Sequence, residues 1–204
     1  MPFLWLGPKE KEILWFLEKS FGNKILQGCD KVSKKAVLVI DMLVDFIYFL
    51  GALYVGDEPA RVVFPIADLL ERERAEGTKI IYVCDRHKRE DAEFKMFPPH
   101  CIEGTKGAGI VSELKPQEGD LIIYKRRYSA FSGTDLDITL REHGINELVL
   151  VGVCTNICVL YTAADARNLN YSVSVPKNCV ASFDSSAHEF ALKEMENTLG
   201  VKVF

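Results

Sequence analysis

Short apolar runs alternate with longer amphipathic segments over most of the chain. The runs that suit strands buried on both faces of a sheet lie at residues 36–40, 79–83, 121–124, 148–151 and 171–175. Segments that predict helices lie at residues 59–75, 134–143, about 156–168 and 185–199, and residues 201–204 supply a last strand. Strand–helix alternation requires a mostly parallel sheet with helices on both faces. The pattern therefore predicts an α/β protein: a three-layer α/β/α fold with a six-stranded, mostly parallel sheet.

Residues 1–34 follow a different pattern, and we predict that they form a helical appendage to a domain spanning residues 35–204. Apolar residues crowd the stretch from Lys9 to Phe21, which predicts a short helix that is apolar over much of its circumference. Such a helix packs either on the flank of its own domain or against a second copy of the chain. A homo-oligomer is therefore one of two open alternatives.

Composition narrows the class of protein. Hydrophobic residues make up 48% of the 204 positions and charged residues 26%, which is typical of a globular domain. A net charge of −4 without a basic stripe argues against a nucleic-acid partner, and no apolar window reaches the length of a membrane span. The first apolar run ends at Pro8 and is too short for a secretion signal. The six cysteines are scattered, so we expect free thiols and a cytoplasmic protein.

Polar side chains follow several of the predicted strands. Asp41 follows the first strand, Asp85 the second and Lys125 the third, and Cys158 lies just beyond the fourth. Ligands of parallel α/β sheets bind beyond the carboxyl ends of the strands, so these side chains are expected to meet there. Each has a plainer interpretation alone: a turn cap, a surface charge and a buried structural thiol for Asp41, Lys125 and Cys158.

Together the three residues suit nucleophilic catalysis. A cysteine attacks as the thiolate, whose usual pKa of about 8.5 falls near a helix start or an ammonium group. We therefore expect Lys125 and the helix after the fourth strand to lower the pKa of Cys158. Asp41 can take the thiol proton and pass it to a departing amine. The turn at residues 152–154 is a candidate source of N–H groups for an oxyanion.

Two sequence motifs carry a resemblance to a known family. The string GVCTNICVLYTAADARNLNYSVSV, which contains Cys158, resembles the nucleophile segment of the isochorismatase-like cysteine hydrolases, and AVLVIDMLVDF is similar to their first strand. The resemblance spans residues 35–204 and implies Cys158 as nucleophile, Asp41 as catalytic carboxylate and Lys125 as the family lysine. It also implies a cis peptide between Val153 and Cys154 in the oxyanion turn.

A second group of residues offers candidate metal ligands. Asp85 and His87 stand two positions apart after a strand, and His100 can return a third ligand. One carboxylate and two imidazoles suit Zn, Mn or Fe(II). Without further support, these histidines would be ordinary polar loop residues.

The stretch FPPHCIEGT resembles the corresponding segment of the nicotinamidase branch. The resemblance implies that Asp85, His87 and His100 bind a divalent transition metal (Zn, Fe or Mn), with Glu93 as fourth ligand and Glu90 or Asp91 as rivals. Phe97 replaces the branch's usual tryptophan and can stack on a flat substrate ring, and Phe46 is expected to line the ring pocket.

The resemblance implies a function in NAD metabolism. The expected reaction converts nicotinamide to nicotinate and ammonia through a cysteine thioester, with the metal positioning the substrate ring. Two alternatives stay open: another cysteine amidase of the family, acting on an N-carbamoyl or related small amide, and a non-catalytic binding protein on the same fold. In each case the expected partner is a small molecule.

Overall fold

The computed structural model describes residues 34–204. The predicted appendage lies outside the described residues apart from Lys34, and so do its helix between Lys9 and Phe21 and the dimer contact considered for it. No helix in the described part of the chain is long and apolar enough to cross a membrane. The cysteines within this part are all free and buried.

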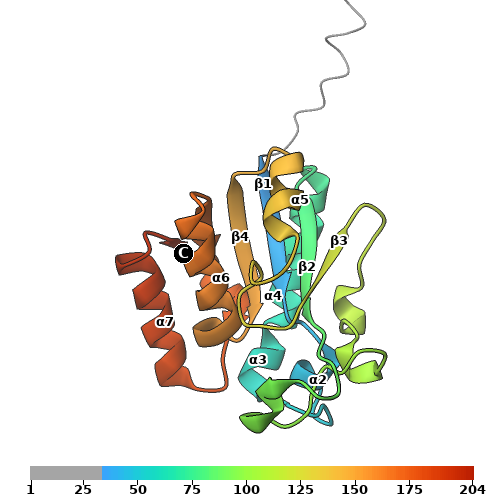
Figure 1. The fold of residues 1–204 in the computed structure, drawn as a ribbon. Helices are drawn as coiled ribbons and strands as arrows, with labels where there is room; N and C mark the ends of the chain where they lie inside the picture. Colours follow the sequence, from blue (N-terminus) through green and yellow to red (C-terminus); the bar gives the residue numbers. More distant parts are fainter. Residues whose placement is uncertain (1–33) are drawn as a thin grey trace, which may run out of the picture. The chain divides into compact units, whose positions relative to one another are not determined.

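Seven parallel strands form the central sheet (Figure 1). Their bounds are β1 Lys35–Ile40, β2 Lys79–Asp85, β3 Leu121–Lys125, β4 Glu147–Val153, β5 Ser172–Val175, β6 Val180–Ala181 and β7 Lys202–Val203. Their order is β3-β2-β1-β4-β5-β7, and β6 pairs separately with β4. The predicted α/β fold is confirmed, with seven strands instead of six. The additional strand, β6, has two residues and is too short to leave a periodic pattern.

Six α-helices connect the strands in the described residues. Their bounds are α2 Val44–Ile47, α3 Asp57–Arg61, α4 Val63–Ala75, α5 Leu136–Glu142, α6 Leu160–Asn168 and α7 Ser185–Asn197. The helix predicted at residues 59–75 is two helices, α3 and α4, and α2 was not predicted. The helix predicted to begin near residue 156 opens with a π-helical turn, Thr155–Val159, before α6.

Helices cover both faces of the sheet, as Figure 1 shows. Leu38 and Ile40 of β1 pack in the core with α5, α6 and α7, whereas Val37 and Val39 point into the core with α2 and α4. Completely burying one such aliphatic side chain contributes about 1.5–3 kcal/mol. The sheet therefore has two cores, which explains the continuous apolar runs in the sequence.

Strand β3 departs from this pattern because it lies at the edge of the sheet. Ile122 and Tyr124 are 41% and 49% exposed, so the prediction that β3 is buried on both faces was wrong. Its apolar sequence resembles that of the central strands, and hydrophobicity alone does not reveal an edge position. The last residue of β3, Lys125, is buried.

The chain changes direction across the sheet between β1 and β4. From β1 it continues to β2 and β3 on one side, and from β4 it continues to β5 on the other. Such a reversal opens a crevice at the carboxyl ends of the two central strands, where α/β proteins bind their ligands.

Candidate active site

A cavity of about 330 Å³ lies at this crevice. Most of the residues predicted for the site line it: Asp41, Phe46, Asp85, Glu93, Phe97, His100, Val153, Cys154 and Cys158. Lys125 and His87 do not line the cavity but contact residues that do. Sequence reasoning missed other lining residues, namely Leu53, Tyr54, Val55, Tyr128, Ile157 and Phe183. Most of these come from connecting segments, whose spatial position has no periodic signal in the sequence.

Asp41, Lys125 and Cys158 meet at the base of the cavity. Lys125 Nζ lies 3.5 Å from Cys158 Sγ and 2.8 Å from Asp41 Oδ2. The sheet register accounts for this arrangement, since β1 lies between the strands that lead to the other two residues. Asp41 itself adopts a positive φ of 55° directly after β1, and its Oδ1 accepts a hydrogen bond of 2.9 Å from the Asp85 N–H.

Asp85 connects this cluster to the predicted metal site. It is the register partner of Lys125 across β2 and β3, and Lys125 Nζ donates a 2.5 Å hydrogen bond to its Oδ1. Burial on its own lowers the pKa of Lys125, but the charges of Asp41 and Asp85 outweigh it and raise that pKa well above its usual value. Lys125 is therefore a permanent buried cation between two carboxylates.

Burial governs the protonation of the candidate nucleophile. It raises the pKa of the Cys158 thiol well above its usual value, and the Asp41 charge adds to the rise, while Lys125 opposes it. Lys125 lowers this pKa as expected, but the expected net decrease is wrong, because a buried thiolate loses its hydration and this cost outweighs the charge of Lys125. The resting group is a neutral thiol, which needs a base at the moment of attack.

Asp41 has the properties of that base. Burial, followed by repulsion from Asp85, raises its pKa to about 6, against the opposing effect of Lys125. Oδ2 of Asp41 faces Lys125 as an ion pair but makes no hydrogen bond of regular geometry to the described residues. Acceptor atoms of Asp41, Asp85 and Cys158 lie within 4.8 Å of one another. Asp41 can thus receive the thiol proton over a short path.

The end of β4 and the turn that follows it have an unusual backbone. Gly152 has a φ of 121°, and a Cβ atom there would overlap the Ile40 carbonyl on β1, so only glycine fits. The Val153–Cys154 peptide bond is cis. Cys158 follows within the π-helical turn, whose first N–H groups lack carbonyl partners inside the helix. The turn can therefore supply N–H donors beside the thiol.

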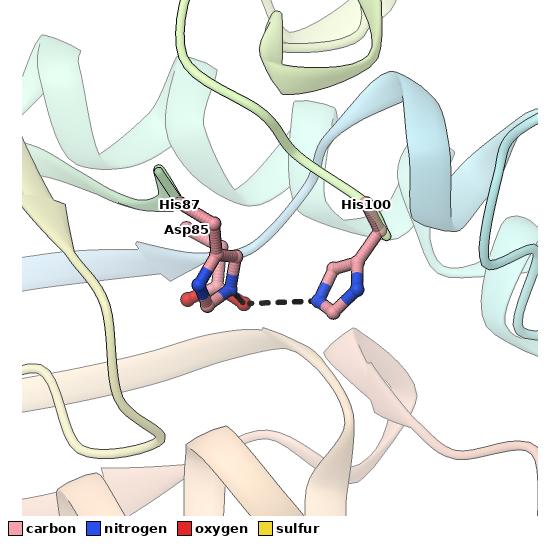
Figure 2. Close-up of side chains that lie close together, drawn as sticks. All are labelled: Asp85, His87 and His100. Atoms are coloured by element: carbon pink, nitrogen blue, oxygen red, sulfur yellow. Dashed lines mark ion pairs between the residues drawn. The ribbon is translucent and has the colours of Figure 1, made fainter. Parts of the chain in front are cut away.

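Asp85, His87 and His100 form a compact group of potential metal ligands. One ligand atom of each lies within 4.8 Å of the others, and all three residues are buried. In Figure 2, His100 reaches across from a loop toward the carboxylate of Asp85, and His87 extends from the end of the same strand as Asp85. Asp85 Oδ2 is 3.6 Å from His87 Nε2 and 4.0 Å from His100 Nε2.

The hydrogen bonds of the two imidazoles suit a bound cation. The Nδ1 atom of His87 lies 3.1 Å from Asp91 Oδ2, and that of His100 lies 2.7 Å from the Pro98 carbonyl. Since both partners are acceptors, each Nδ1 acts as the donor, and in the neutral imidazole each Nε2 then offers its lone pair. Nε2 of His87 is buried without a hydrogen-bond partner among residues 34–204. The donor set fits a divalent transition metal, which would satisfy this atom.

The three candidates for a fourth ligand differ in position. Glu93 is buried and lines the cavity, where burial and then Asp85 raise its pKa. Asp91 instead caps the short 3₁₀ helix that carries Glu93, accepting its N–H at 3.1 Å, and also contacts His87 and Arg127. Glu90 is exposed. Of the three candidates, Glu93 alone is buried and lines the cavity, but it does not belong to the group whose ligand atoms lie within 4.8 Å of one another, and Asp91 supports His87.

The fold, the cysteine-bearing turn and the buried acidic cluster together define the class: a parallel α/β protein with a thiol and carboxylates at the carboxyl edge of its sheet. Residues 35–203 match the isochorismatase domain, so the chain belongs to the isochorismatase family. The family predicted from the sequence motifs is thereby confirmed.

A bacterial and a plant relative are similar in sequence to most of this chain. The uncharacterized isochorismatase family protein PncA of Bacillus subtilis is 39% identical over 180 residues, covering 83% of this chain and 98% of the relative. A probable inactive nicotinamidase of Arabidopsis thaliana is 34% identical over 178 residues, covering 82% of this chain and 90% of the relative.

Solved structures with this fold include several amidases. A pyrazinamidase/nicotinamidase of Streptococcus mutans has a TM-score of 0.80 and 39% identity, covering 83% of this chain and 99% of that one. An N-carbamoylsarcosine amidase of Thermoplasma acidophilum has a TM-score of 0.76 and 34% identity, with coverages of 83% and 94%. A pyrazinamidase of Pyrococcus horikoshii in complex with zinc has a TM-score of 0.79 and 30% identity, with coverages of 84% and 98%.

Proposed function

We propose that this chain is a cysteine amidohydrolase that converts nicotinamide to nicotinate and ammonia. The observation that carries the proposal is one cavity onto which two groups open: Cys158 with Asp41, and the potential metal ligands Asp85 and His100. A thiol with an adjacent base suits cleavage of an amide, and a metal beside it suits the ring of a heteroaromatic substrate. The same proposal includes a cytoplasmic role in NAD metabolism.

Acylation begins when Cys158 Sγ attacks the amide carbon and Asp41 accepts the thiol proton. Lys125 stabilises the negative charge that develops on sulfur, and the N–H groups of Cys154 and Cys158 donate to the oxyanion. Asp41 then returns the proton to the amide nitrogen, the C–N bond breaks and ammonia leaves. The product of this stage is a thioester on Cys158.

Deacylation uses the same groups in the reverse order. A water molecule attacks the thioester carbon while Asp41 accepts one of its protons. The C–S bond breaks, and the thiolate takes the proton from Asp41, which releases the carboxylic acid. Each turnover therefore returns Asp41 and Cys158 to their starting protonation states.

The metal part of the proposal assigns Asp85, His87, His100 and Glu93 as ligands of a Zn, Fe or Mn ion. When bound, the ion supplies a Lewis acid that can hold a ring nitrogen of the substrate. The zinc complex of the Pyrococcus horikoshii pyrazinamidase supports this assignment. Phe46 and Phe97 line the same cavity and offer flat surfaces for the ring.

The charge of the cavity supports a neutral amide as substrate. Asp41, Asp85 and Glu93 line it, and none of its lining residues among the described positions is Lys or Arg. A substrate with its own carboxylate, such as N-carbamoylsarcosine, would find no lining Lys or Arg with which to pair, since Lys125 already pairs with Asp41 and Asp85. Nicotinamide carries no charge and needs no such partner.

Ammonia release by the purified protein tests the proposal. Wild-type protein and Cys158→Ala are each given nicotinamide or N-carbamoylsarcosine, with bound metal measured on the same samples. The proposal expects release from nicotinamide by the wild type alone. Turnover of N-carbamoylsarcosine in preference would move the chain to the carbamoyl-amide group, and no turnover of either would favour the non-catalytic alternative.

A further inference from the structure

Asp45 joins two segments that are distant in the sequence. Its Oδ1 accepts a hydrogen bond of 3.0 Å from the Ala52 N–H, and its Oδ2 accepts one of 2.8 Å from the Cys101 N–H. Asp45 belongs to α2, which follows the strand that ends beside Asp41. It is not among the residues that line the cavity, so it acts on the site only through its neighbours.

The segment around Cys101 carries a candidate metal ligand, His100. Cys101 directly follows His100, is completely buried and adopts a positive φ of 44°. Its carbonyl accepts a hydrogen bond of 2.9 Å from the His87 N–H. The Cys101 backbone is therefore held by Asp45 on one side and by His87 on the other. This arrangement fixes the loop from which His100 reaches toward Asp85 in Figure 2.

The segment that begins at Ala52 forms a wall of the cavity. Leu53, Tyr54 and Val55 line the cavity directly after Ala52. The main-chain carbonyl of Asp45 accepts a bond of 3.1 Å from the Leu53 N–H, which adds to the side-chain bond to Ala52. One residue thus anchors this wall with both its main chain and its side chain.

A glycine keeps the carboxylate in place. A Cβ atom at Gly107 would overlap both carboxylate oxygens of Asp45. Gly107 lies in the 3₁₀ helix Lys106–Ala108, which contacts α2. Its lack of a side chain allows the carboxylate to reach the Ala52 and Cys101 N–H groups together.

The geometry points to Asp45 as a positioning residue that fixes the position of His100 relative to the cavity wall at residues 53–55. A metal ion bound by His100 would then lie at a set distance from this wall, and so would a substrate ring held by the ion. The part that concerns metal binding rests on the proposed function. The mechanical link between the two segments does not depend on it.

Asp45→Asn tests this role because it keeps the shape of the side chain but replaces one acceptor with an N–H₂ group. We expect zinc binding, measured by competition with a chromogenic chelator, to weaken about 10–100-fold, as for other supports of metal ligands. Hydrogen exchange measured by mass spectrometry should rise in peptides covering both residues 51–55 and 98–103. In turnover of nicotinamide, KM should rise more than kcat falls. The matched control is Asp68→Asn in α4, an exposed position that should change none of these.

Gly107→Ala provides an independent route, since it leaves Asp45 in the chain and displaces its carboxylate. We expect the same changes in zinc affinity and in exchange of both segments, and smaller changes in Gly109→Ala of the same loop, where a Cβ atom would meet the Lys106 carbonyl at 3.0 Å and not Asp45. Zinc affinity within twofold of wild type in both variants, or faster exchange in only one segment, overturns the inference. Wild-type protein that binds no zinc contradicts the proposed metal site instead, and the exchange results then decide the link between the segments.

Discussion

The two halves of the candidate site differ in how the chain holds them. In the nucleophile half, Asp41 and Lys125 lie at or directly after strand ends, and Cys158 lies in the helical turn after β4. Their charges are already matched, because Lys125 contacts both Asp41 and Asp85. In the metal half, His100 comes from the irregular segment between β2 and β3, and His87 Nε2 is buried without a partner in the described residues.

This difference separates a half whose buried charges are matched within the protein from one in which a cation would satisfy a buried imidazole nitrogen. Strand ends are positioned by the sheet, so the nucleophile half needs little additional support. Histidines on loops need hydrogen bonds to orient them, and here these come from Asp91, the Pro98 carbonyl and, through Cys101, Asp45. We therefore expect mutations in the two halves to have different consequences.

The largest effect is expected for Cys158→Ala. Loss of the nucleophile should lower kcat for nicotinamide by at least about 10³-fold, because the remaining groups cannot form a thioester. Metal affinity should stay near that of wild type, since the ligands are untouched. Steady-state kinetics and a metal titration on the same protein check both parts, with Cys179→Ala as a control at a buried cysteine outside the cavity. Full activity in Cys158→Ala would reject the nucleophile assignment.

Lys125→Met should be the most damaging change for stability. It leaves Asp41 and Asp85 buried together without their cation, which typically costs about 3–5 kcal/mol in the free energy of unfolding. Urea denaturation measures the loss, and Lys115→Met at an exposed position is the matched control. Equal stability of the two variants would mean that Lys125 does not balance the carboxylates.

Asp91→Asn should affect the metal half alone. It weakens the acceptor for His87 Nδ1–H, and loss of such supports typically lowers metal affinity about 10–100-fold. The exposed neighbour Glu90→Gln should leave affinity unchanged. Zinc titration of both variants against a competing chelator gives the comparison. Equal weakening by Glu90→Gln would point to general electrostatics instead of orientation of His87.

The smallest effect, and the most specific to the nucleophile half, concerns thiol reactivity in Asp41→Asn. The Asp41 charge raises the pKa of Cys158, so its removal should lower that pKa and increase the thiolate fraction at neutral pH. Alkylation of Cys158 by iodoacetamide should accordingly become faster than in wild type while turnover is lost. Slower alkylation would mean that Asp41 promotes thiolate formation at rest.

The sequence predicted the residues of the nucleophile half better than the other residues that line the cavity. Strand periodicity locates the carboxyl edge of the sheet, so Asp41, Asp85 and Lys125 could be expected to meet. The resemblance, and not the periodicity, gave the support for Cys158 as nucleophile and for Asp85, His87 and His100 as metal ligands. The assignments of roles to these residues stay predictions until the variants are measured.

Other features depended on packing that the sequence does not encode locally. The raised pKa of Cys158 follows from its burial, which outweighs the charge of Lys125. The edge position of β3 depends on the order of all the strands. Tyr128 and Phe183 reach the cavity from connecting segments, and the role of Asp45 follows from contacts with residues up to 56 positions away.

The central claim is that Cys158 forms a covalent thioester with the substrate, and the most direct test is to trap it. Protein is quenched in acid during turnover of nicotinamide, digested and analysed by mass spectrometry. The account predicts a nicotinoyl group on the peptide that contains Cys158, assigned to that residue by fragmentation and absent from Cys158→Ala. Ammonia release without any adduct on Cys158, or an adduct on Cys154 instead, would contradict it.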